Sequence, residues 1–158
     1  MKLQGIYVPL VTPFTTDNQI DYPVLEQLAE VMIAKGVAGI VAFGTTGEYY
    51  SFSTEERHEV LQRIAAVAKG RVQLVVGIND LSTANSIEHA KTAQKYGYEA
   101  LMLAAPPYSL PTQEGVIRHF EKVANEQDLP IIMYNYPDRI GVGLDFETVN
   151  HLRQHPKI

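Results

Sequence analysis

The stretch that decides the fold is an apolar run, Val37–Phe43, followed directly by Gly44-Thr45-Thr46-Gly47-Glu48. The run is continuous rather than alternating, which is typical of a strand that is covered on both faces in a parallel sheet. The two glycines free the backbone of the following turn, and its two hydroxyls and amides can converge on a small carboxylate. An ordinary polar strand-to-helix turn has the same residue types, so the turn alone leaves both interpretations open.

Similar apolar runs recur along the chain, each followed by a segment of helical length and mixed polarity. The runs are Gly5–Thr12, Val37–Phe43, Val72–Ile78, Ala100–Ala104 and Pro130–Tyr134. Their spacing of about thirty residues is typical of strands that alternate with helices. We therefore predict an α/β protein with about five βα units and a parallel sheet.

Capping residues mark where the intervening helices begin and end. Ser53-Thr54-Glu55-Glu56 is a capping box, in which the serine and the second glutamate bond each other's main-chain amides. Asp21-Tyr22-Pro23 opens the first helix, with proline in the first turn, where its missing N–H costs nothing. We also expect N-caps at Ser82, Thr112 and Asp145, and left-handed glycines after helices at Gly36, Gly70 and Gly97.

Two architectures fit such repeats, a doubly wound sheet and a (β/α)8 TIM barrel. The chain length of 158 residues favours the doubly wound sheet, because a complete barrel needs about 250 residues. The sequence has no GxGxxG, GxxxxGK[ST] or GxSxG motif, which argues against a nucleotide-binding doubly wound domain. With no linker-like stretch, residues 1–158 are predicted to belong to a single domain.

Composition excludes several functional classes. The net charge of −5 and thinly spread basic residues argue against a nucleic-acid partner. The absence of cysteine excludes disulfides and thiolate metal sites. The first residues lack the apolar segment of a signal peptide, and no apolar run approaches the roughly 20 residues of a membrane helix. We expect a soluble cytoplasmic protein without a membrane partner.

Polar and aromatic residues also follow the later strands. Tyr134 ends the fifth run, where it could move protons, and Arg139 could grip a carboxylate with two hydrogen bonds. Both residues could equally be structural or surface groups. Tyr108 lies in a proline-stiffened loop, and an exposed tyrosine of this kind belongs more often to an interface than to a catalytic site. Gly77-Ile78-Asn79-Asp80 is interpreted as a turn and a helix cap.

The histidines do not form a convincing metal site. His151 and His155 have the i, i+4 spacing of ligands on a helix, but the residues between them include no carboxylate. We therefore predict no metal site. His58, His89 and His119 fall within helices beside charged residues, and we expect them on the surface.

At this point the sequence resembles one family, the dihydrodipicolinate synthase and N-acetylneuraminate lyase family of pyruvate-dependent aldolases. The segments that carry the likeness are Gly5–Phe14, Gly44–Glu48, Pro107–Gly115 and Tyr134-Asn135-Tyr136-Pro137. They occur in the order and at the separations of the family, and together they span the chain. The resemblance implies the barrel in place of the doubly wound sheet, with residues 1–158 as the N-terminal part of a single (β/α)8-barrel domain.

The resemblance also implies residue roles. Thr45 and Thr46 would hold the carboxylate of a 2-keto acid, in a turn shaped by Gly44 and Gly47. Tyr134 would be the proton shuttle, and Thr45 would link it to Tyr108, which in the family reaches across a dimer interface. Arg139 matches an arginine that helps bind the second substrate in synthases. The implied protein needs no cofactor and is a homo-oligomer, a dimer or tetramer.

The implied chemistry requires a lysine at the end of a sixth strand, where it condenses with the ketone of the substrate. The lysines of this chain precede strands or lie on helices and at helix ends, so we expect the nucleophile beyond Ile158 and an inactive chain when it is alone. Thr54 and Arg57 replace histidines of lysine-regulated synthases, so feedback inhibition by lysine is not expected.

Three functional alternatives remain from the sequence. Arg139 favours a synthase. Tyr136 and the third-strand loop, Gly77–Asp80, favour a 2-keto-3-deoxy-sugar-acid or N-acetylneuraminate-type aldolase. The third alternative is a non-catalytic partial barrel or fragment.

Overall fold

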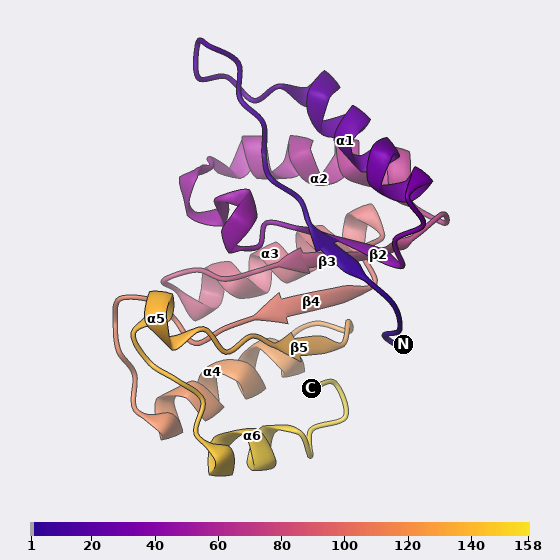
Figure 1. Ribbon diagram of the computed structural model, residues 1–158. Coiled ribbons are helices and arrows are strands. Elements are labelled where there is room, and N and C mark those ends of the chain that lie inside the picture. The colour runs from indigo at the N-terminus through magenta and orange to yellow at the C-terminus, as the bar shows by residue number, and fades with distance from the viewer. Residues whose placement is uncertain (1) are drawn as a thin grey trace. The chain divides into compact units, whose positions relative to one another are not determined.

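The computed structural model describes residues 2–158 (Figure 1). These residues form two compact units, one of residues 2–77 with Lys95–Glu99 and one of Ile78–Gln94 with Ala100–Ile158. Strands and helices alternate in both units, so the predicted βα repeat is confirmed. No helix within residues 2–158 is long and apolar enough to cross a membrane.

The first unit contains three parallel strands that hydrogen-bond in chain order. These are β1 (Tyr7–Pro9), β2 (Gly39–Ala42) and β3 (Gln73–Gly77). Gly39 faces Tyr7 across the sheet, and a Cβ at this position would overlap the tyrosine ring. All four residues of β2 are buried, as its unbroken apolar run predicts.

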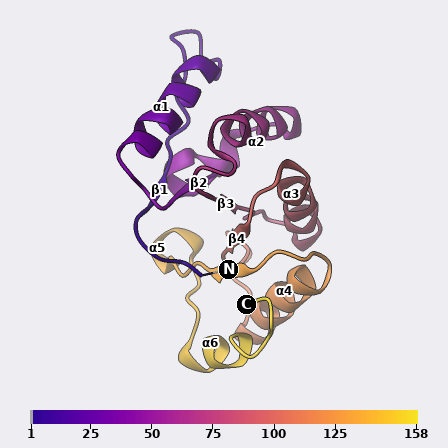
Figure 2. The same cartoon turned by 90° about the vertical axis from the view of Figure 1, so that its right-hand side faces the viewer.

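Two long helices complete the first unit, α1 (Tyr22–Ala34) and α2 (Thr54–Ala68), which pack against each other (Figures 1 and 2). The predicted capping box of α2 is confirmed, because Ser53 Oγ accepts from Glu56 N at 3.2 Å and Glu56 Oε2 accepts from Ser53 N at 2.8 Å. At the start of α1, Asp21 Oδ1 accepts from Val24 N at 3.1 Å.

The second unit contains the parallel pair β4 (Ala100–Leu103) and β5 (Ile131–Met133), with Leu101 opposite Ile131. Its helices are α3 (Thr83–Tyr96, whose last two residues belong to the first unit), α4 (Gln113–Asn125), α5 (Pro137–Ile140) and α6 (Phe146–Leu152). Helices α4 and α6 pack together below β5 in Figure 1.

The predicted helix boundaries are largely confirmed. Gly36, Gly70 and Gly97 all have positive φ, between 77° and 85°. Thr112 caps α4 by accepting from Gly115 N at 3.3 Å. Asp145 occupies the N-cap position of α6, but its side chain makes no capping bond. The residues after β5, which we expected to be a loop, include the short helix α5.

The prediction that His119 lies on the surface is wrong. His119 is only 4% exposed, and its Nδ1 lies 2.8 Å from Thr83 Oγ1. The charged neighbours in the sequence were misleading, because helical spacing puts His119 on the same stripe as the buried Val116, Phe120 and Val123. His58 and His89 are partly buried.

Candidate functional site

The glycine–threonine turn lies at the C-terminal end of β2. Two short 3₁₀ helices follow the strand, η1 (Thr45–Gly47) and η2 (Tyr49–Ser51). Gly47 N donates to Gly44 O at 3.1 Å, and Thr12 Oγ1 donates to Gly47 O at 3.0 Å. A Cβ at Gly47 would lie 2.9 Å from Leu10 O, so the close approach of the first-strand segment requires glycine here.

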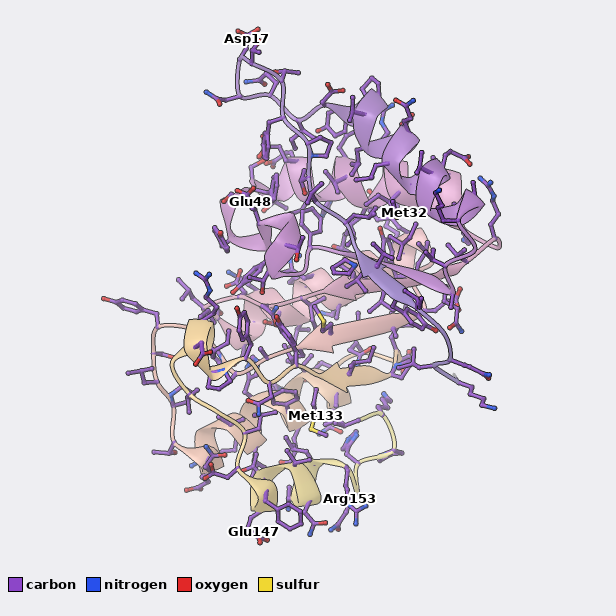
Figure 3. The ribbon with its side chains drawn as sticks, in the orientation of Figure 1. Asp17, Met32, Glu48, Met133, Glu147 and Arg153 are labelled. Carbon is purple, nitrogen blue, oxygen red and sulfur yellow. The ribbon has the colours of Figure 1, made fainter. Side chains whose placement is uncertain are left out.

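Two residues that are not glycine flank the turn in the left-handed conformation. Phe43 has φ +50°, and Glu48, labelled in Figure 3, has φ +56°. Such conformations cost about 1–3 kcal/mol each and persist where surrounding contacts hold them, often at functional sites. The conformation of residues 44–48 is therefore imposed by its surroundings rather than by local preference.

Thr45 and Thr46 stand at the start of η1, where a helical turn leaves its first amides without acceptors inside the turn. Thr45 is partly buried and Thr46 is exposed. The turn thus offers two hydroxyls and main-chain amides within a few residues, a donor set that suits a carboxylate. That these hydroxyls and amides bind a substrate carboxylate stays a prediction.

Tyr134 directly follows β5, where Met133 is labelled in Figure 3. Its main-chain N donates to Leu103 O at 2.8 Å, which continues the β4–β5 pairing to this residue. The side chain is partly buried, and its ring centroid lies 5.9 Å from that of Tyr136. The phenol therefore stands at the C-terminal end of a strand, the end at which barrel enzymes place their reactive groups.

Arg139 lies on the short helix α5, close to Tyr134 along the chain, and is exposed. The helix closes with Gly141 in the left-handed conformation, φ +85°, and Gly141 N donates to Pro137 O at 2.7 Å. An exposed guanidinium on a short capped helix can form paired hydrogen bonds with a carboxylate that arrives from solvent.

Tyr108 projects from the loop after β4. The residue is 90% exposed and has φ +68°, and Leu110 in the same loop is 60% exposed with φ +46°. Tyr108 is therefore an exposed aromatic side chain in a strained loop, and its place at an interface stays a prediction.

The third-strand loop has the structural role that the sequence favoured. Asn79 is buried, and its Oδ1 accepts from Ala104 N at 2.7 Å. Asp80 Oδ1 accepts from Ser82 N at 2.9 Å and from Asn85 Nδ2 at 3.0 Å, which connects the loop to the first turn of α3. Within residues 2–158, no group of three or more histidine, aspartate or glutamate side chains could hold a metal ion.

The candidate residues fall into two groups. Gly44, Thr45, Thr46 and Gly47 share one turn in the first unit, whereas Tyr108, Tyr134 and Arg139 belong to the second unit. Sequence reasoning missed Arg57, which is 4% exposed although it is charged. Its position on the same stripe as Val60, Leu61 and Ile64 of α2 was the signal that could have revealed its burial.

Parallel strands that alternate with helices, with glycine, threonine and tyrosine at the strand ends, define a (β/α)8-barrel type of protein. Residues 2–158 match the Dihydrodipicolinate synthetase family, and the chain belongs to that family. The fold is that of the N-terminal part of its barrel, since solved members superpose on almost the whole chain.

Three relatives illustrate the match. The 4-hydroxy-tetrahydrodipicolinate synthase of Leptospira biflexa is 40% identical over 155 residues, which are 98% of this chain and 52% of the relative. The solved synthase of Methylacidiphilum fumariolicum is 39% identical with a TM-score of 0.94, covering 99% of this chain and 52% of that one. The solved chloride-inhibited dihydrodipicolinate synthase of Acinetobacter baumannii, complexed with pyruvate, is 40% identical with a TM-score of 0.96. The match covers 99% of this chain and 54% of that one. The chain spans about half the length of these relatives.

Proposed function

We propose that the complete protein is a Schiff-base-forming lyase that acts on pyruvate or another 2-keto acid, as a 4-hydroxy-tetrahydrodipicolinate synthase does. The observation that carries the proposal is the 40% identity to a named synthase along 98% of this chain. The strand-end groups support it, because a hydroxyl-rich turn and a phenol are what binding a keto acid and moving its protons require.

Within this proposal, Thr45 and Thr46 bind the substrate carboxylate, and Gly44 and Gly47 give the turn its shape. Tyr134 carries protons during formation of the Schiff base and during the carbon–carbon step, with Thr45 and Tyr108 in the proton relay. Arg139 binds a carboxylate of the second substrate. The support for these assignments is the resemblance in motif and the presence of each group in the segment that follows a strand.

The proposed reaction needs an amine nucleophile. An amine that is desolvated or placed near other cations is neutral enough to attack a ketone, and the resulting iminium withdraws electrons from the carbon that reacts. Lys157 does not fit this role, because its Nζ bonds Gln127 O and lies 3.3 Å from Asp128. We place the Schiff-base lysine in the part of the relatives' length that this chain does not cover.

A second candidate is a 2-keto-3-deoxy-sugar-acid or N-acetylneuraminate-type aldolase. Tyr136 favours it, since a second phenol beside Tyr134 adds a hydroxyl that could contact a polyhydroxylated substrate.

We also propose a cytoplasmic location and a homo-oligomer, a dimer or tetramer.

The decisive experiment is borohydride trapping of pyruvate on the full-length polypeptide that contains this chain. Reduction should leave a stable adduct whose mass equals the protein plus reduced pyruvate, and peptide mapping should place it on one lysine. A full-length protein that gives no adduct with pyruvate or other 2-keto acids would overturn the proposal. Comparing condensation with aspartate semialdehyde against cleavage of deoxy-keto acids then separates the synthase from the aldolase.

A further inference from the structure

Arg57 is a buried charge beside the glycine–threonine turn. Burying a guanidinium is costly unless its donors are bonded. Nη1 donates to Tyr49 O and Nη2 donates to Gly77 O, both at 3.1 Å. The guanidinium carbon also lies 4.2 Å from the centre of the Phe43 ring, within the range of a cation–π contact.

These three contacts connect Arg57 to residues at both ends of the turn and to the neighbouring strand. Phe43 is the residue before the turn, Tyr49 opens η2 directly after it, and Gly77 ends β3, the neighbouring strand. One side chain thus joins both ends of residues 44–48 to the sheet. Because Phe43 and Glu48 are held in the left-handed conformation, contacts of this kind are required to keep the turn in place.

The packing at Gly77 shows how closely the parts approach each other. A Cβ there would overlap the carbonyl oxygen of Phe43, so β3 contacts the main chain at the entrance to the turn. Phe52 packs edge-on against the Phe43 ring with centroids 5.2 Å apart. The Phe43 ring therefore contacts both Phe52 and the guanidinium of Arg57, which restrains it further.

Helix stability does not explain an arginine at this position. Arg57 is the fourth residue of α2, and a positive charge near the N-terminus of a helix is unfavourable, whereas Glu55 and Glu56 are favourable there. Lysine could not replace it fully, because an ammonium lacks the planar fork that bonds two carbonyl groups while stacking on a ring. The features of arginine that matter here are those that act on the turn.

We propose that Arg57 is a positioning residue that fixes the turn of residues 44–48 on the end of β3, so that Thr45 and Thr46 meet the carboxylate of the 2-keto acid. The substrate part of this proposal rests on the proposed function. Arg57 acts through main-chain carbonyls and the Phe43 ring and does not itself bind substrate.

The first test measures amide hydrogen exchange in the 158-residue chain. The variants are Arg57→Met, Arg57→Lys and the control Arg63→Met, which removes a partly exposed arginine from the same helix. Arg57→Met should accelerate exchange at the bonded amides of Gly47, Glu48 and Ser51 by about tenfold or more, with β2 amides unchanged. If Arg57→Met does not fold, Arg57→Lys should still accelerate them by about threefold. If these amides exchange no faster in the Arg57 variants than in Arg63→Met, the proposal is overturned.

The second test uses borohydride trapping on the full-length polypeptide. Both Arg57 variants should raise the pyruvate concentration for half-maximal adduct, by roughly tenfold in Arg57→Met and less in Arg57→Lys, while the maximal adduct stays unchanged. A raised half-maximal concentration with an unchanged maximal adduct indicates weaker substrate binding at the turn rather than a misfolded protein. An adduct with an unshifted half-maximal concentration overturns the positioning role. Absence of any adduct from the unmodified protein instead overturns the proposed function, and the exchange experiment then decides whether Arg57 fixes the turn.

Discussion

His119 is a buried titratable residue, and its surroundings set its charge. Burial lowers the pKa of His119 to about 4, and hydrogen bonding to the main chain at Ala104 opposes this shift only in part. The imidazole is therefore neutral in the folded protein at neutral pH, with Nδ1 2.8 Å from Thr83 Oγ1. The unfolded chain returns the histidine to a pKa of about 6.5, so folding and protonation are linked.

This linkage predicts an acid-dependent loss of stability. The stabilising contribution is present above about pH 6.5 and is lost as the pH falls towards 4, because the unfolded state binds the proton more readily. Between pH 7 and pH 4.5 the free energy of unfolding should fall on the order of 2 kcal/mol more in the wild type than in His119→Gln. Urea denaturation at the two pH values measures this difference. The control His151→Gln changes an exposed histidine and leaves His119 in place, so the extra loss of stability that His119 causes should remain.

At the scale of single elements, helix α2 offers a direct test of local stability. Both reciprocal bonds of the Ser53–Glu56 capping box are present, so Ser53→Ala removes an acceptor for a main-chain amide. We expect a loss of about 1 kcal/mol in the free energy of unfolding. Chemical denaturation checks it, with Ser51→Ala, an exposed serine in η2, as the matched control. Equal stability of the two variants would show that the cap contributes nothing measurable.

The elements that the sequence predicted well are those with local signals. The strand cores, the capping box and the left-handed Gly36, Gly70 and Gly97 depend on periodicity or on residues within one turn of each other. The 3₁₀ helices η1 and η2 could not be predicted in this way. Their main chain is bonded by Thr12, which is distant in the sequence, and by Arg57, whose burial no local pattern of capping or turn residues indicates.

The candidate site was predicted less completely than the fold. Motif resemblance predicts site residues in the turn after β2 and at the tyrosine after β5, and both stand at strand ends, although their roles stay predictions. The burial of Arg57 was missed, because a charged residue between charged neighbours has an ordinary surface pattern. Substrate chemistry depends on which groups face the same ligand, and a pattern of residue types along one chain does not encode that geometry.

At the scale of the whole molecule, Tyr108 connects the loop after β4 to the proposed homo-oligomer. Its 90% exposure and left-handed φ are unfavourable for an isolated chain, since an aromatic ring in water gains nothing from a strained loop. A second subunit that accepts the ring would offset this cost. If Tyr108 completes the site of its neighbour, each active site in the full-length protein takes residues from two subunits.

Subunit mixing tests this arrangement in the full-length polypeptide. Tyr108→Phe and Tyr134→Phe should each lower turnover strongly when alone, with pyruvate adduct formation nearly intact in Tyr108→Phe. In a mixed dimer, a subunit that keeps Tyr134 receives Tyr108 from its partner and regains one intact site. Unfolding and refolding an equal mixture should then restore about a quarter of wild-type turnover, because about half the dimers are mixed and each has one complete site. Recovery no greater than the average of the two variants would place Tyr108 outside the partner's site.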